Sequence, residues 1–347
     1  MQISMNPTPS RGRPWVWSIT IFLAILVLGV FYAKWEPYYF KMLTAASTHS
    51  IGHSIVTGAS NRAPAAGWQA AWQYGLAYFQ DIWVALLVGL LVGAGVQTLL
   101  PASWLYRVFG RARAKGCLWA VLLAVPSMMC TCCSAPIVVS MKRQQLPTGA
   151  ALAYWLANPL LNPATILFMG FVLGWNWAVL RIVMGALLVL GVSWLGARDP
   201  ATEGMMSAPP VDEPPTLGKF AREFGRLVVR LLPEYLVIVF LLGAVRSWLF
   251  PAMNPGLGAS WWLMLIFAVV GTLFVIPTAG EVPIVQTLMH FGLGLGPAGT
   301  LMITLPAVSL PSMAMVGQQV GVKEMAKVAA IVAVAGLVTG LLAMWLL

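Results

Sequence analysis

The sequence VPSMMCTCCSAP, residues 125–136, places two thioethers and three thiols within six consecutive positions, between two prolines. It lies in an apolar segment, 118–140, that is long enough to cross a bilayer as a helix. Pro126 and Pro136 interrupt this segment, and proline in a helix leaves backbone groups unpaired that lipid cannot satisfy. Such a break persists only inside protein or beside a cavity. The segment is therefore predicted to be a broken, re-entrant hairpin.

A second apolar segment, 261–290, contains a similar break around Gly280. The two breaks correspond in an internal repeat, because Ser134–Val138 aligns with Glu281–Val285 at an offset of 147 residues. A further aligned pair, at an offset of 150 residues, is Leu86–Pro101 and Leu236–Pro251. Repeats with broken helices that meet near the middle of the bilayer are typical of transporters, whose substrate site lies at the breaks.

Charge placement sets the predicted topology. The basic loops 101–117 and 197–230 should both be cytoplasmic, and they fall on one side only if segment 118–140 re-enters. Re-entry of segment 261–290 likewise brings Lys323 and Lys327 to the cytoplasmic side. In this topology the two halves run in opposite directions across the membrane, and the N-terminus is cytoplasmic.

The composition identifies an integral membrane protein. Of 347 residues, 60% are hydrophobic and only 9% are charged, whereas a soluble domain carries about 25% charged residues. Basic residues exceed acidic ones by 20 to 10. They lie mostly in short loops between apolar runs, which is the pattern of topology signals, so no nucleic-acid partner is expected.

The predicted fold is an all-α polytopic membrane protein with inverted structural repeats, two broken or re-entrant hairpins and an extra N-terminal helix. The predicted parts are an N-terminal transmembrane helix and outer segment (1–80), a first membrane repeat (81–196), a cytoplasmic linker (197–230) and a second membrane repeat (231–347). The linker contains four prolines, which is typical of a flexible connection.

Cys130, Cys132 and Cys133 at membrane depth indicate a soft, thiophilic substrate, such as a trivalent arsenical or a soft metal ion, because thiolate sulfur prefers such partners. Free cysteines and methionines are also ordinary core residues, so packing is the competing interpretation. The neighbouring Met128 and Met129 fit packing better than ligation.

Glu281 is the one acid deep within an apolar run. A charge near the bilayer centre costs at least about 2.5 kcal/mol, so such residues usually face a cavity. Glu281 is predicted to carry a proton for antiport or to balance a cationic substrate, although it could instead cap a half-helix. Asn158, Asn162 and Thr278 lie beside prolines and either line the path or join helices.

Two further patterns give structural expectations. Arg181 and Arg246 are predicted to extend from outer helix ends towards the membrane interface. Glycines four residues apart are predicted to allow close helix contacts. These pairs are Gly89/Gly93, Gly170/Gly174 and Gly336/Gly340.

The motifs together resemble one bacterial family. Cys130-Thr131-Cys132 with Pro136, Asn158-Pro159 and Asn162-Pro163, and the stretch from Pro277 to Pro283 are similar to the motifs of the ArsP-type permeases. That family includes exporters of trivalent organoarsenicals, and the resemblance covers both halves from about residue 82. Cys132-Cys133 departs from the family pattern of one cysteine followed by a small polar residue, which leaves open which thiols bind.

The resemblance implies a multi-pass permease of the bacterial cytoplasmic (inner) membrane rather than an enzyme, with no cofactor and no resident metal. Its partners would be the lipid bilayer, a small-molecule or soft-ion substrate and, as a further candidate, a second copy of the chain. The predicted function is export of a thiophilic substrate such as a trivalent organoarsenical by alternating access, with proton antiport as a candidate coupling mechanism.

Two alternatives stay open. The substrate could be a soft metal ion or a small sulfur-containing anion, the latter held by half-helix N-termini. A different class of protein, a membrane thiol–disulfide oxidoreductase, also fits a cysteine cluster. Such enzymes usually relay electrons to a second cysteine pair outside the membrane, and the fourth cysteine, Cys117, has no neighbouring partner in the sequence.

Overall fold

The computed structural model describes residues 13–52, 55, 67–110, 113–196, 214–249 and 261–347. Within these ranges every regular element is a helix, and six helices are long and apolar enough to cross a bilayer. This confirms the prediction of an all-α polytopic membrane protein. The six spans are Trp15–Thr48, Ala71–Thr98, Thr148–Val172, Trp175–Gly196, Leu217–Ala244 and Val322–Leu346.

The N-terminal helix is longer than its hydropathy predicts. Helix α1 (Arg13–Val30) continues through a π-helical turn (Phe31–Trp35) into α2 (Glu36–Thr48). The sequence has its first apolar run at residues 15–32, but the helix continues beyond this run, and the π-helical turn buries Lys34, the charge that follows it. The outer segment of the predicted N-terminal part, 1–80, is also partly helical, since α3 (Trp68–Thr98) begins before residue 81.

Both predicted hairpins are present in the structure. In the first, α5 (Arg113–Ala124) and a short 3-10 turn lead to a break, from which α6 (Thr131–Arg143) returns. In the second, α12 (Trp261–Leu273) leads through an extended break to α13 (Glu281–His290). A helix of 13 residues is only about 20 Å long, which is too short to cross about 30 Å of hydrocarbon.

The remaining helices form two broken pairs and two long spans. In the first half, α7 (Thr148–Leu160) and α8 (Pro163–Val172) precede α9 (Trp175–Gly196). In the second half, α14 (Leu295–Ala307) and α15 (Leu310–Val320), bent by 49°, precede α16 (Val322–Leu346). The short α4 (Ala102–Phe109) and the long α11 (Leu217–Leu249) complete the chain.

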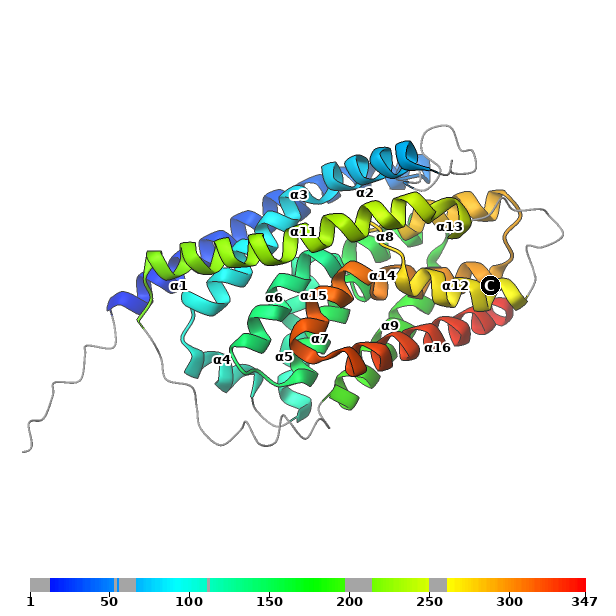
Figure 1. Ribbon diagram of the computed structural model, residues 1–347. Helices are drawn as coiled ribbons and strands as arrows, with labels where there is room; N and C mark the ends of the chain where they lie inside the picture. The colour runs from blue at the N-terminus through cyan, green and yellow to red at the C-terminus, as the bar shows by residue number, and fades with distance from the viewer. Residues whose placement is uncertain (1–12, 53–54, 56–66, 111–112, 197–213, 250–260) are drawn as a thin grey trace, which may run out of the picture.

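The two halves repeat the same packing. Helix α7 packs on α5 and α9, and α14 packs in the same way on α12 and α16. The 147-residue offset extends beyond the hairpins, because Asn162 caps α8 and Ser309 caps α15. Figure 1 shows α3 and α11 side by side and running in opposite directions, as inverted repeats require.

The segment predicted as the linker, 197–230, is only partly described. Helix α11 begins at Leu217, so the last part of this segment is helical, while residues 197–213 lie outside the described ranges. The division of the chain into parts at residues 81, 197 and 231 stays a prediction.

Glycine allows the closest helix contact of the first hairpin. A Cβ added to Gly89 on α3 would lie 2.0 Å from the backbone oxygen of Cys133 on α6. A Cβ added to Gly336 on α16 would lie 2.3 Å from the side-chain methyl group of Thr304 on α14. The prediction fails for Gly174, which has a positive φ of 115° and open space around it, because it ends a turn.

Candidate substrate site

The two hairpin breaks meet inside the bundle and border one small cavity, with free space for about one water molecule. Residues of both halves line it, so the cavity lies where the repeats face each other. Its lining consists of Cys130, Thr131, Pro159, Thr165, Ile276, Pro277, Thr278, Ala279, Glu281, Leu305 and Pro306. Three residues predicted from the sequence, Cys130, Thr278 and Glu281, are thus brought together.

Asn158 holds the first break in place. Its Oδ1 accepts hydrogen bonds from the backbone nitrogen of Met129, at 3.2 Å, and from the hydroxyl of Ser127. Its Nδ2 donates to the carbonyl oxygen of Tyr154. The side chain is completely buried and does not line the cavity. Asn158 therefore positions the thiol-bearing turn, and Met128, which has a positive φ of 49°, completes that turn.

The three clustered thiols do not share one face. Cys130 precedes α6 as its N-cap, and its Sγ lies 2.9 Å from the Sγ of Cys133. Cys132 points elsewhere, with its Sγ 3.4 Å from the hydroxyl of Ser309 and 3.8 Å from that of Tyr78. Positions three apart in a helix lie on one face, whereas positions two apart do not. All three thiols are free and buried.

The backbone carbonyl groups of the second break accept hydrogen bonds from tyrosine side chains. The tyrosine hydroxyls of Tyr74 and Tyr78 on α3 donate to the backbone oxygens of Val275 and Ile276. Tyr38 on α2 donates to the backbone oxygen of Thr278. Backbone groups released from a helix at membrane depth need such partners. The extended break can therefore persist inside the bundle, with the Thr278 side chain on the cavity.

Arg181 corrects the sequence-based expectation. It does not extend to the interface: it is completely buried in α9, and its Nη2 lies 2.8 Å from Oε1 of Glu281. It also donates to the carbonyl oxygens of Pro159, Leu160 and Met302. The side chain of Arg246 lies outside what the structure describes.

Helix ends and prolines explain why this ion pair forms. Pro159 and Leu160 are at the C-terminal end of α7, where the partial negative charge of a helix favours a cation. Glu281 is in the first turn of α13, where an acid is favoured. The carbonyl of Met302 is available because Pro306, four residues later, has no N–H to donate to it.

Asn162 has a local role. Its Oδ1 caps α8 by accepting hydrogen bonds from the backbone nitrogens of Ala164 and Thr165. Its Nδ2 is buried and has no hydrogen-bond partner within the described part of the chain. Asn162 itself does not line the cavity, whereas Thr165, one turn later, does.

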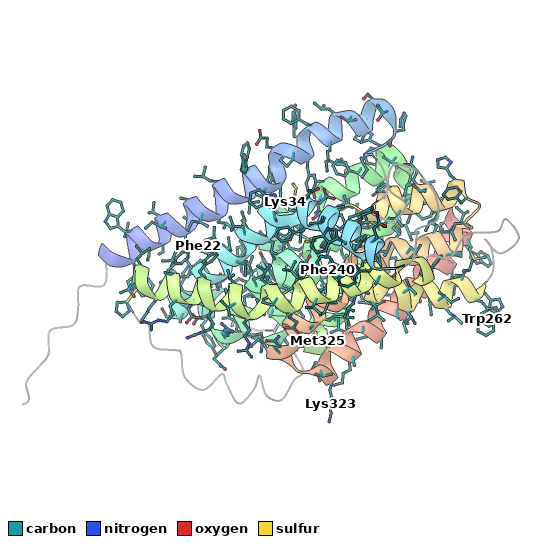
Figure 2. The ribbon with its side chains drawn as sticks, turned by 45° about the horizontal axis from the view of Figure 1, so that its top comes forward. Phe22, Lys34, Phe240, Trp262, Lys323 and Met325 are labelled. Atoms are coloured by element: carbon teal, nitrogen blue, oxygen red, sulfur yellow. The ribbon has the colours of Figure 1, made fainter. Side chains whose placement is uncertain are left out.

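Lys34 is a residue of this region that hydropathy alone did not identify. It lies on the π-helical turn, is 3% exposed, and donates to the hydroxyl of Thr278 at 2.8 Å. Figure 2 shows it on the side of the N-terminal helix that faces the bundle, whereas Lys323 projects outwards. The apolar residues that continue after Lys34, such as Phe40 and Leu43, were the signal that the helix runs on.

Two opposed broken hairpins, buried charges and a cavity between inverted repeats define a polytopic membrane permease. The chain belongs to the ArsP_1 family of predicted permeases, whose model matches residues 73–344. The N-terminal helix lies before the matched region.

Curated relatives agree with this assignment. The chain is 44% identical to the UPF0718 protein YraQ of Escherichia coli (strain K12), covering 94% of this chain and 95% of that protein. It is 21% identical to the UPF0718 protein MJ0584 of Methanocaldococcus jannaschii, covering 69% of this chain and 85% of that protein. No solved structure matches.

Proposed function

We propose that this permease exports a soft, thiophilic substrate that binds to Cys130 and Cys133. A trivalent organoarsenical is the first candidate for this substrate. The observation that carries the proposal is the contact of these two thiols at a hairpin break that borders the cavity between the repeats. Cys132 is separate from the pair and serves packing or the hydrogen bonds to Ser309 and Tyr78.

The binding chemistry needs no oxidant or reductant. A trivalent organoarsenical in water carries two hydroxyl groups on arsenic. Two arsenic–oxygen bonds break and two arsenic–sulfur bonds form with Cys130 and Cys133, while arsenic stays trivalent and two water molecules leave. Because the thiols lie three positions apart at one helix end, one arsenic atom can bridge them after a small adjustment.

The proposed orientation of the permease in the membrane rests on the placement of its charged residues. Arg143 at the end of α6 and Glu223 near the start of α11 lie 3.7 Å apart, and Arg226 and Arg230 follow on α11. This basic end should face the cytoplasm of a bacterial inner membrane, which also places the start of α1 inside. In alternating access, the substrate binds from this end and leaves at the other.

Proton coupling through Glu281 requires the ion pair with Arg181 to open. Removing the charge of Glu281 while Arg181 stays buried would leave an uncompensated cation, which costs about 3–5 kcal/mol. We therefore propose that Glu281 is protonated only after the second hairpin has moved away from α9. In this mechanism the proton enters while the permease is in its outward-facing state.

The test compares thiol variants. Cys130→Ser/Cys133→Ser should abolish binding of phenylarsenite to purified protein and resistance of cells to it, because both sulfur ligands are lost. Cys132→Ser and Cys117→Ser, each tested separately, are the matched controls and should retain both properties. Phenylarsenite binding that survives the double substitution in folded protein would contradict the proposal.

The contact of Cys130 and Cys133 also favours a second candidate, a thiol–disulfide oxidoreductase. A Cys-x-x-Cys pair at a helix N-terminus is a recurring redox arrangement. The other cysteines, Cys117 and Cys132, form no second pair. Turnover of a Cys130–Cys133 disulfide with a quinone would support this candidate, whereas reversible arsenical binding without a change in oxidation state supports the permease.

A soft metal ion is the other open substrate class. Within the described residues, no three His, Cys, Asp or Glu side chains are grouped so that they could hold a metal ion. Two thiols alone suit a soft monovalent ion such as Cu(I) better than Zn(II), which takes four ligands. Competition between Cu(I) and phenylarsenite for the thiol pair would rank the two substrates. A small sulfur-containing anion would bind without the thiols, so its binding would survive Cys130→Ser/Cys133→Ser.

A further inference from the structure

Lys34 is a buried cation whose hydrogen-bond partners are neutral hydroxyl groups. Its Nζ lies 2.8 Å from the hydroxyl of Thr278 and 3.4 Å from that of Tyr38. Among the described residues, Asp81 on α3 is an acid near enough to interact with it. The side chain of Asp81 is exposed, however, and it forms no ion pair with Lys34. The ammonium group therefore has no carboxylate in direct contact with it in the described part of the molecule.

A buried charge needs an opposite charge nearby, because desolvation is strongly unfavourable. The other buried cation at the cavity, Arg181, is balanced by Glu281. The positive charge of Lys34 has no such partner. The structure places one kind of group beside it that can carry the missing negative charge, the thiols of Cys130 and Cys133, both of which interact electrostatically with the ammonium.

Three features of the surroundings of the thiol pair favour a negative charge on it. Cys130 is the N-cap of α6, so the pair lies at the positive end of a helix. The hydroxyl of Thr278 accepts a hydrogen bond from the ammonium, and Thr278 lines the same cavity as Cys130, with which it interacts. The Cys133 sulfur, 2.9 Å from that of Cys130, can share a proton with it. Thiolates form at helix N-termini and beside cations.

We propose that Lys34 belongs to the substrate site and balances a single negative charge on the Cys130–Cys133 pair, which rests as one thiol and one thiolate. The proposal deepens the proposed function, on which its substrate chemistry rests. It assigns the N-terminal helix, which lies outside the region matched by the family, a direct role at the site. Lys34 acts here as a positioning residue that does not itself bind arsenic.

The other ionisable groups around the pair do not supply this charge. Tyr38, Tyr78 and Tyr235 surround it from α2, α3 and α11, and phenols are neutral near pH 7. Cys132 faces Ser309 and Tyr78 instead of Lys34. The carboxylate of Glu281 is already balanced by Arg181. The thiol–thiolate pair therefore makes the described surroundings of the cavity neutral.

A chemical consequence follows for substrate capture. When a dihydroxy arsenical binds a thiol and a thiolate, two arsenic–oxygen bonds break and two arsenic–sulfur bonds form. One hydroxide leaves as water with the thiol proton, and the other leaves with a proton from the medium. Capture therefore takes up one proton per arsenical, whereas two neutral thiols would take up none.

The first experiment measures the thiolate directly. In a Cys117→Ser/Cys132→Ser background, the alkylation rate of the remaining pair by iodoacetamide is followed against pH. Lys34→Met should move the midpoint of this profile up by about one to three pH units, the effect expected of a nearby opposite charge. Lys34→Arg should largely restore it. Lys41→Met, at an exposed position on the same helix, should leave it unchanged.

The second experiment counts protons. Phenylarsenite is titrated into the purified protein in weakly buffered solution, and proton uptake is measured with an indicator dye. Wild type should take up about one proton per arsenical bound, from the stoichiometry above, and Lys34→Met none. If Lys34→Met is not recovered folded, Thr278→Val, which keeps the shape but removes the linking hydroxyl, should reduce the alkylation shift in the same direction.

The outcomes separate the two proposals. Unchanged alkylation profiles in Lys34→Met and Thr278→Val would overturn the thiolate assignment, even if arsenical binding is intact. Loss of arsenical binding in Lys34→Met with an unchanged alkylation profile would also overturn it, because Lys34 would then affect binding without affecting the charge of the thiols. If wild type binds no arsenical, the proposed function fails, while the alkylation profile still decides the role of Lys34.

Discussion

At the scale of single residues, the ion pair of Arg181 and Glu281 is the feature that changes the chemistry most. An isolated intramembrane acid suggests a proton carrier. An acid held by a buried arginine, which also binds three carbonyl oxygens, is first a connection between elements. It joins the second hairpin to α9 and to the broken ends of α7 and α14. Opening this pair is therefore the expected barrier to hairpin movement.

Removing the charge of one partner should destabilise the fold more than removing the charges of both partners. Glu281→Gln leaves Arg181 buried without a counter-charge and should lower the free energy of unfolding by about 3–5 kcal/mol. Arg181→Met/Glu281→Gln should recover a large part of this loss. Thermal unfolding in mild detergent measures both. Glu324→Gln, which removes the exposed pair with Lys327, is the control and should change stability by at most about 1 kcal/mol.

Equal destabilisation by the single and double variants would show that the two side chains act independently. In that case the barrier to hairpin movement would lie elsewhere, and Glu281 would be free to act as a proton carrier without a prior rearrangement.

At the scale of helices, close packing against α3 fixes the position of the thiol pair. The backbone of α6 approaches α3 at Gly89, where a Cβ would overlap the backbone oxygen of Cys133. A backbone atom cannot move aside as a side chain can, so even one methyl group must push the two helices apart. The hairpin that carries Cys130 would move with α6.

Gly89→Ala should therefore lower the free energy of unfolding by about 1–3 kcal/mol, as overpacking does. It should also reduce arsenical affinity by displacing the thiol pair. Gly191→Ala on α9 is the matched control, because nothing lies within 4 Å of the added Cβ, and it should retain stability and binding. Denaturation in detergent and phenylarsenite titration provide the two measurements. Wild-type behaviour of Gly89→Ala would mean that α6 is not held by this contact.

The elements that the sequence predicts well are those governed by local signals. Proline and glycine within apolar runs located both hairpin breaks, because the loss of backbone hydrogen bonds is a property of the residues themselves. Hydropathy underestimates the N-terminal helix, since the apolar run ends before Lys34 whereas the helix continues to Thr48. The π-helical turn that buries Lys34 depends on Thr278 and Tyr38, and the segment around Thr278 is distant in sequence.

The candidate site also depends on contacts between segments that are distant in sequence, so the sequence predicts it less completely than the hairpins. The repeat aligns the two breaks, which predicts that the cysteines of the first break lie close to Glu281 of the second. The structure places Cys130 and Glu281 on one cavity, together with Thr278. Arg181 could not be found in this way, since its partner lies on a helix of the other half and apolar periodicity does not report which neighbour a helix face meets. The separation of Cys132 from the other thiols likewise depends on where α6 begins.

At the scale of the whole molecule, the opposed entry of the two hairpins is what makes alternating access possible. Basic residues gather where α6 ends and α11 begins, and the second hairpin returns to the opposite end, where Gln286 of α13 contacts the backbone of His49 at the end of α2. A site between two hairpins of opposite entry can be opened towards either side by moving one of them. The proposed mechanism therefore depends on both hairpins re-entering.

Topology mapping tests this dependence. In a background without native cysteines, Lys115→Cys at the start of α5 and Gln145→Cys just after α6 should both resist a membrane-impermeant thiol reagent in intact cells, and react once the membrane is opened. Trp262→Cys and Phe291→Cys, at the two ends of the second hairpin, should both react in intact cells. If either hairpin crossed the membrane, its two positions would react from opposite sides, and the repeats would no longer be inverted. Because a folded but inactive protein still reports its topology, this result stands whatever the substrate is.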